Sequence, residues 1–100
     1  MSRTSAIARA EAYFDGGGFL NDLTRRVAIP SSSQEPERAG ALRSYLLDEI
    51  VPALTRLGFT CRLLDNPSGP PVLAAERLEN PHLVTALIYG HGDTIRGLDD

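Results

Sequence analysis

The expected fold depends on residues 83–89, which run Leu-Val-Thr-Ala-Leu-Ile-Tyr and are almost continuously apolar. Such a run is typical of a strand covered on both faces, as in a parallel or mixed sheet layered by helices. The preceding Asn80-Pro81 pair indicates a break between elements. We therefore predict a buried central strand at this place in the chain.

A β-hairpin is expected upstream of that strand. Residues 59–63 alternate between apolar and polar side chains, as a half-buried strand does, and residues 72–78 have the composition of a return strand. Between the two, residues 66–71 run Asn-Pro-Ser-Gly-Pro-Pro, which is dense turn chemistry.

The first half of the chain predicts helices. Residues 4–14 are Ala-rich, and residues 19–28 carry an apolar stripe at helical spacing. A longer helix should begin at Pro36 and end at Gly58, a residue suited to a left-handed stop. Pro52 should kink or divide it, because the proline ring clashes with the preceding turn.

These elements predict a single α/β domain over residues 1–100, with N-terminal helices, a hairpin and a buried strand of a mixed sheet. Apolar and charged fractions of 42% and 23% are ordinary for a globular protein. Residues 96–100 resemble the opening of a loop more than a natural end. We therefore expect the sheet to be unfinished and the chain to be the N-terminal part of a larger domain.

Charge and cysteine usage narrow the classes of partner. Ten basic and thirteen acidic residues are scattered along the chain, whereas nucleic-acid binding needs a clustered positive surface. No apolar run approaches the ~20 residues of a membrane span. The single cysteine, Cys61, cannot form an internal disulfide, which favours the reducing cytoplasm. We expect a small-molecule or peptide substrate, and neither nucleic acid nor membrane as a partner.

The residues with candidate chemistry directly follow the predicted strand, at positions 90–94, Gly-His-Gly-Asp-Thr. Ligands of open α/β sheets bind beyond the carboxyl ends of strands. His91 and Asp93 are two residues apart, so on an extended backbone they project to the same face. A carboxylate beside an imidazole can fix the ring's tautomer and improve it as a metal ligand. Gly90 and Gly92 should leave room for a bound ion or substrate.

Spacing alone leaves other interpretations open. A lone histidine near a strand end is commonly structural, and an Asp-Thr pair is commonly a cap or turn. The other histidine, His82, lies at the opposite end of the predicted strand, roughly 30 Å away at ~3.3 Å per residue. A catalytic zinc needs about three protein ligands, and the sequence convincingly offers one.

Residues 86–94 resemble the first metal motif of the aminoacylase/carboxypeptidase family of di-zinc hydrolases. That family includes acetylornithine deacetylase, succinyl-diaminopimelate desuccinylase and glutamate carboxypeptidase. Its pattern is an apolar strand followed by Gly, His, any residue and Asp. Residues 23–33, which contain Ile29-Pro30-Ser31, resemble the family's N-terminal helix and the turn that ends it. The order of helix, hairpin and motif is similar too, so the resemblance spans about residues 19–93.

The resemblance implies a three-layer α/β/α catalytic domain that hydrolyses amide bonds in N-acyl amino acids or short peptides. His91 would bind one ion of a pair of divalent metals, zinc or else cobalt or manganese, and Asp93 would be the catalytic aspartate that orients His91. The glutamate general base and the other ligands would lie beyond residue 100, and the chain alone would be inactive. For the full-length protein, a homodimer is one of the expected oligomeric states.

Two alternatives remain at this stage. In an α/β-hydrolase, too, a hairpin precedes a buried strand ending in His-Gly, and loop N–H groups there build an oxyanion hole. The long helices and the Ile29-Pro30-Ser31 turn fit that class poorly. The other alternative is a family-like module that no longer binds metal and serves as an interaction or structural domain.

Overall fold

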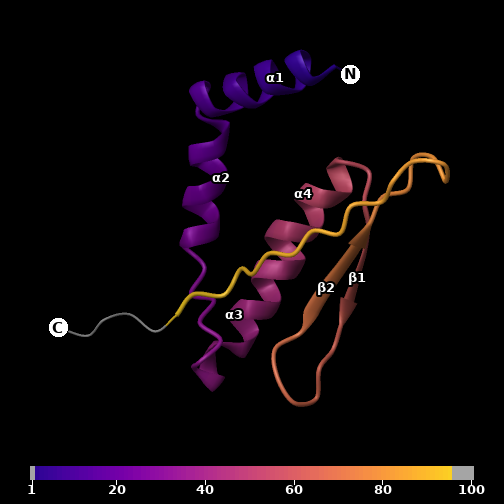
Figure 1. The fold of residues 1–100 in the computed structure, drawn as a ribbon. Helices are drawn as coiled ribbons and strands as arrows, with labels where there is room; N and C mark the ends of the chain where they lie inside the picture. The colour runs from indigo at the N-terminus through magenta and orange to yellow at the C-terminus, as the bar shows by residue number, and fades with distance from the viewer. Residues whose placement is uncertain (1, 96–100) are drawn as a thin grey trace.

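The computed structural model describes residues 2–95, in which helices are followed by a two-stranded sheet (Figure 1). The α-helices are α1 (Arg3–Asp15), α2 (Gly18–Val27), α3 (Ala39–Ser44) and α4 (Val51–Arg56), and the strands are β1 (Thr60–Leu64) and β2 (Val72–Glu76). A 3-10 turn, η1 (Pro36–Arg38), precedes α3, and a π-helical stretch, η2 (Tyr45–Ile50), joins α3 to α4. The predicted mixture of α and β structure, with the helices first, is confirmed.

The two N-terminal helices lie to one side of α4 and the hairpin (Figure 1), and Arg25 of α2 pairs with Glu49 of η2 at 3.2 Å. A capping box starts α1, in which the Ser2 hydroxyl accepts from the Ser5 N–H at 3.1 Å and satisfies a free helix donor. Phe14 and Phe19 pack across the junction with ring centroids 5.6 Å apart. None of the described helices is both long and apolar enough to cross a membrane.

The long helix predicted from Pro36 to Gly58 changes type in its middle. Pro52 has no N–H, so the carbonyl four residues before it loses its α-helical donor. The chain forms the wider turns of η2 just before the proline. There the Val51 N–H donates a hydrogen bond to the Leu46 carbonyl, five residues back. The predicted division at Pro52 is therefore a change of helix type. Gly58 ends the helical region with φ at +87°, in the predicted left-handed conformation.

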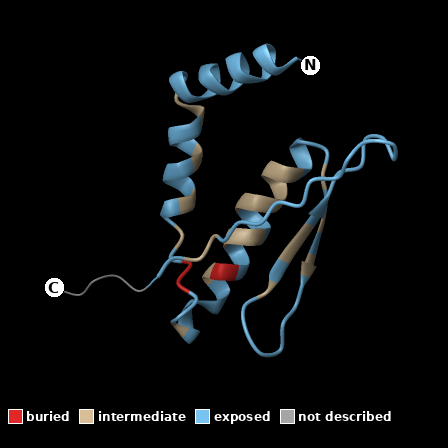
Figure 2. Cartoon of the chain, in the orientation of Figure 1, coloured by how far each residue is buried: buried red, intermediate tan, exposed pale blue. Residues whose placement is uncertain are grey.

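The predicted hairpin is confirmed. Strand β1 pairs antiparallel with β2, so that Thr60 lies opposite Glu76. Alternate residues of β1, Cys61 and Leu63, are half-buried, whereas Thr60 is exposed, because strand side chains alternate between faces. Helix α4 contacts β1. Among the described residues, the apolar residue that is buried is Leu42 in α3, in the same helical layer as α4 (Figure 2).

The prediction of a buried strand at residues 83–89 is wrong in this structure. The segment runs irregularly from the hairpin to the loop after α2 (Figure 1), and Val84 and Leu87 are 98% and 99% exposed. An apolar strand is buried only where neighbouring strands and a covering layer exist. The sheet formed by the described residues has just β1 and β2, and neither pairs with this segment. Residues 96–100, expected to open a loop, lie outside the described residues.

Candidate functional site

The two stretches that resemble family motifs lie against each other, although they are far apart in the sequence. Ser32, in the loop after α2, forms a parallel bridge with Thr94. The Thr94 N–H donates to the Ser31 carbonyl at 3.0 Å, and the Ser31 hydroxyl donates to the Gly92 carbonyl at 2.9 Å. Ser31 and Ser32 are 2% and 7% exposed, so this junction is the most buried polar part of the described chain (Figure 2).

His91 and Asp93 face each other at this junction. The His91 Nδ1 lies 3.1 Å from Asp93 Oδ1 and 3.3 Å from the backbone carbonyl oxygen of Asp93. With its proton on Nδ1, the ring donates to the carboxylate and keeps a free lone pair on Nε2. The His91 side chain is 69% exposed and that of Asp93 is 35% exposed. The predicted sharing of one face is therefore present, with the ring open to solvent.

Asp93 is held by a second residue that sequence reasoning did not assign. The Ser33 hydroxyl donates to Asp93 Oδ2 at 2.5 Å, so each carboxylate oxygen has its own partner. The hydrogen bond from Ser33 is the main cause that lowers the pKa of Asp93. Partial burial opposes it, and the hydrogen bond from His91 adds to the lowering. Asp93 is therefore ionised at neutral pH.

The sequence predicts that Gly92 leaves room for a ligand. In the structure it does not. A Cβ placed on Gly92 would lie 1.9 Å from Cε1 and 2.6 Å from the hydroxyl oxygen of Tyr45, so the tyrosine ring already occupies that space. Tyr45 is the first residue of η2, which connects the altered helix to the site. Around Gly90, in contrast, a Cβ would meet nothing within 4 Å.

His91 fits one ligand position of a metal site. An imidazole whose Nδ1 is bound by a carboxylate presents Nε2, which is how histidine ligands are commonly held. Within residues 2–95, no group of three or more His, Cys, Asp or Glu side chains could hold a metal ion. His82 is exposed in a turn where its N–H donates to the Asn80 side chain. The described residues thus offer one imidazole nitrogen, His91 Nε2, and one carboxylate partner, Asp93.

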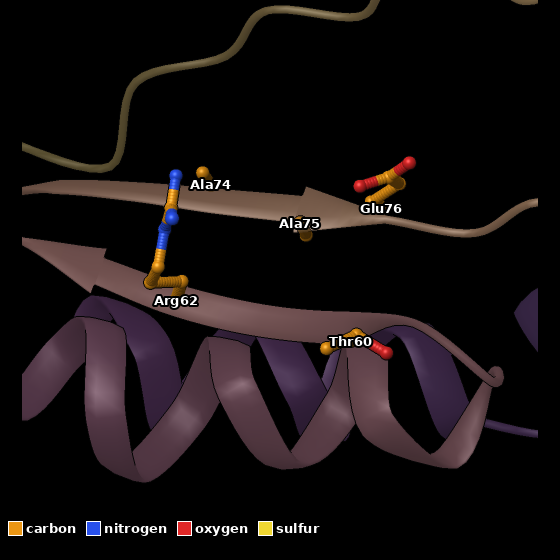
Figure 3. A pocket seen from close by; sticks show the side chains of 5 residues that line it. All are labelled: Thr60, Arg62, Ala74, Ala75 and Glu76. Carbon is orange, nitrogen blue, oxygen red and sulfur yellow. The ribbon is translucent and has the colours of Figure 1, made fainter.

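A hollow of about 370 Å³ lies elsewhere, on the outer face of the hairpin (Figure 3). Its lining residues are Thr60, Arg62, Ala74, Ala75 and Glu76. Figure 3 shows the Arg62 and Glu76 side chains on the face of the strands turned away from the helix. A second hollow of about 210 Å³ touches the site through Ser33 and is otherwise lined mainly by Pro, Ala and Leu side chains. The candidate site is therefore next to the smaller hollow.

Ser33 and Tyr45 are the contributors that sequence reasoning missed. Ser33 belongs to the stretch with the Ile29-Pro30-Ser31 turn, and this position was the one sequence feature that could have indicated a role at the site. Tyr45 carried no signal, because it lies within a helix far from the motif in sequence. No family model, no curated protein and no solved structure matches the chain.

Proposed function

We propose that the chain supplies the first metal-ligand segment of a metal-dependent hydrolase that cleaves amide bonds in N-acyl amino acids or short peptides. The observation that carries the proposal is the 3.1 Å contact between His91 Nδ1 and Asp93 Oδ1. Its support is the resemblance of two separate stretches to the di-zinc aminoacylase/carboxypeptidase family, since these stretches are in contact here through Ser31 and Thr94.

In this proposal His91 binds one of two divalent ions, zinc or else cobalt or manganese, through Nε2. Asp93 accepts the Nδ1 proton in a hydrogen bond, which fixes the tautomer and raises the basicity of the ligand nitrogen. When bound, the metal supplies Lewis-acid chemistry for amide hydrolysis. The other ligands and the general base come from outside the described residues.

The same proposal makes residues 83–89 a strand of a three-layer α/β/α domain in the complete protein. Its support is the length and apolar character of this run. The expected small-molecule or peptide substrate and a cytoplasmic location belong to the proposal as well, the latter supported by the lone Cys61.

The test is an assay of the protein expressed from its complete gene on a panel of N-acetyl amino acids and dipeptides. Activity should disappear after a chelator removes the metal and return with zinc, cobalt or manganese. Asp93→Ala should lower turnover on the order of 10–100-fold, because it removes the partner of a metal ligand.

The matched control is Asp65→Ala. Asp65 is 77% exposed and its ion pair is with Arg43, so its removal should leave turnover unchanged. Hydrolysis that survives complete removal of the metal would overturn the proposed function.

A further inference from the structure

We propose that Ser33 is a positioning residue for the His91–Asp93 pair: its hydroxyl holds the second carboxylate oxygen and keeps the first aimed at the imidazole. The role rests on the proposed function, because it acts through the aspartate that orients a metal ligand. It adds to that function a residue 60 positions away in the sequence from the carboxylate that it holds.

The geometry explains why a second contact matters. The carboxylate torsion of aspartate is broad and roughly two-fold, so one hydrogen bond leaves the group free to turn. The imidazole that provides one bond is itself 69% exposed and is a weak anchor. The bond from Ser33 Oγ to Oδ2, at 2.5 Å, is of the charge-assisted kind between a hydroxyl and an ionised carboxylate. Two bonds from two different loops leave the carboxylate one orientation.

The three neighbouring serines have different surroundings. The Ser31 hydroxyl and carbonyl bond backbone atoms of Gly92 and Thr94, so Ser31 joins the two loops. The Ser32 hydroxyl oxygen is buried and has no hydrogen-bond partner within the described part of the chain. Ser33 is exposed, and its hydroxyl reaches a side chain of the site. Ser31 and the backbone of Ser32 therefore fix the loop, and Ser33 acts from that fixed loop on Asp93.

The first test compares Ser33→Ala, Ser33→Thr and Ser32→Ala in the protein expressed from its complete gene. Ser33→Ala should lower kcat about 10-fold, at the small end of the range for outer partners of a metal ligand, with little change in KM. Ser33→Thr should retain most of the wild-type kcat, because threonine keeps the hydroxyl and the exposed position has room for its methyl group. Ser32→Ala removes a hydroxyl without a partner and should leave kcat unchanged.

The second test separates positioning from general support of the fold. In a protein that already carries Asp93→Ala, adding Ser33→Ala should not lower the thermal unfolding midpoint further, because the carboxylate that Ser33 holds is gone. A residue with a purely structural role would still lower it.

The outcomes assign failure to one proposal or the other. A wild-type protein without metal-dependent hydrolysis overturns the proposed function and the role of Ser33 with it. An active wild type in which Ser33→Ala matches Ser32→Ala, or in which Ser33→Thr fails to restore kcat, overturns the role of Ser33 alone. So does a further loss of stability in the Asp93→Ala background.

Discussion

Gly92 separates the two site residues, and the ring of Tyr45 fills the space where a side chain would stand. In Gly92→Ala a methyl group would meet ring atoms at 1.9 Å, so either the ring or the backbone between His91 and Asp93 must move. We expect the free energy of unfolding to fall by about 1–3 kcal/mol, the usual cost of overpacking. Urea unfolding of the complete protein measures it.

Gly90→Ala is the control for that substitution, because a methyl group there would meet nothing within 4 Å. Its effect should stay within about 0.5 kcal/mol, as at other open surface positions. Equal losses of stability in the two variants would show that the Tyr45 contact does not constrain the motif.

At this scale, local spacing predicts local geometry. The approach of His91 to Asp93 was foreseeable, because residues two apart on an extended backbone share a face. The contacts of Ser33 and Tyr45 with the motif were not, because they depend on how a loop and a helix distant in sequence come together. No periodicity or spacing within either segment encodes that meeting.

Among the secondary-structure elements, the end of α4 depends on one backbone conformation. Gly58 has φ at +87°, which a residue with a Cβ adopts at a cost of roughly 1–2 kcal/mol. We therefore expect Gly58→Ala to lower the free energy of unfolding by about that amount, measured by chemical denaturation of the complete protein.

Gly40 provides the opposite case within the same helical region. It lies in α3, its φ is not positive, and a Cβ would meet nothing within 4 Å. Gly40→Ala should raise stability by about 0.5–1 kcal/mol, since alanine loses less backbone freedom on folding. Destabilisation by Gly40→Ala, or a neutral Gly58→Ala, would contradict this account of the helix.

The helices and the hairpin were largely predictable, because their signals are local. Helical spacing, Gly58 and the turn residues 66–71 each act within a few positions. The π-helical form of η2 was not foreseen. Pro52 predicts that the helical hydrogen bonds are interrupted. The backbone can respond by a kink, a gap or a wider turn, and neighbouring packing selects among these.

Over the whole molecule, the main feature is a run of apolar side chains without cover. Val84, Leu87, Ile88 and Tyr89 are each at least 87% exposed. Exposed apolar patches and unpaired extended backbone promote association. We expect the 100-residue chain to self-associate in solution as its concentration rises, and Leu87→Lys to reduce this association, as measured by light scattering.

Leu20→Lys is the matched control, because Leu20 is also exposed, at 63%, but lies on α2, which is a regular helix. It should reduce association less than Leu87→Lys does. Equal effects would mean that total apolar exposure, and not the extended run, governs association.

The position of this run explains the limit of prediction at the largest scale. A continuous apolar segment predicts a covered strand, but covering it requires partner strands and a second layer. Within residues 2–95 the sheet contains two strands, so the segment stays exposed and the motif at its end is held by the loop after α2. Long-range assembly, which no local pattern encodes, decides where residues 83–89 lie.

The most direct measurement of the central claim is the metal content of the complete protein and of its two single-histidine variants. His91→Ala should bind less zinc than wild type by elemental analysis, because it removes a ligand nitrogen. His82→Ala should match wild type, because His82 is an exposed turn residue. Unchanged metal in the His91 variant, or an equal loss in both, would contradict the assignment of His91 as a metal ligand.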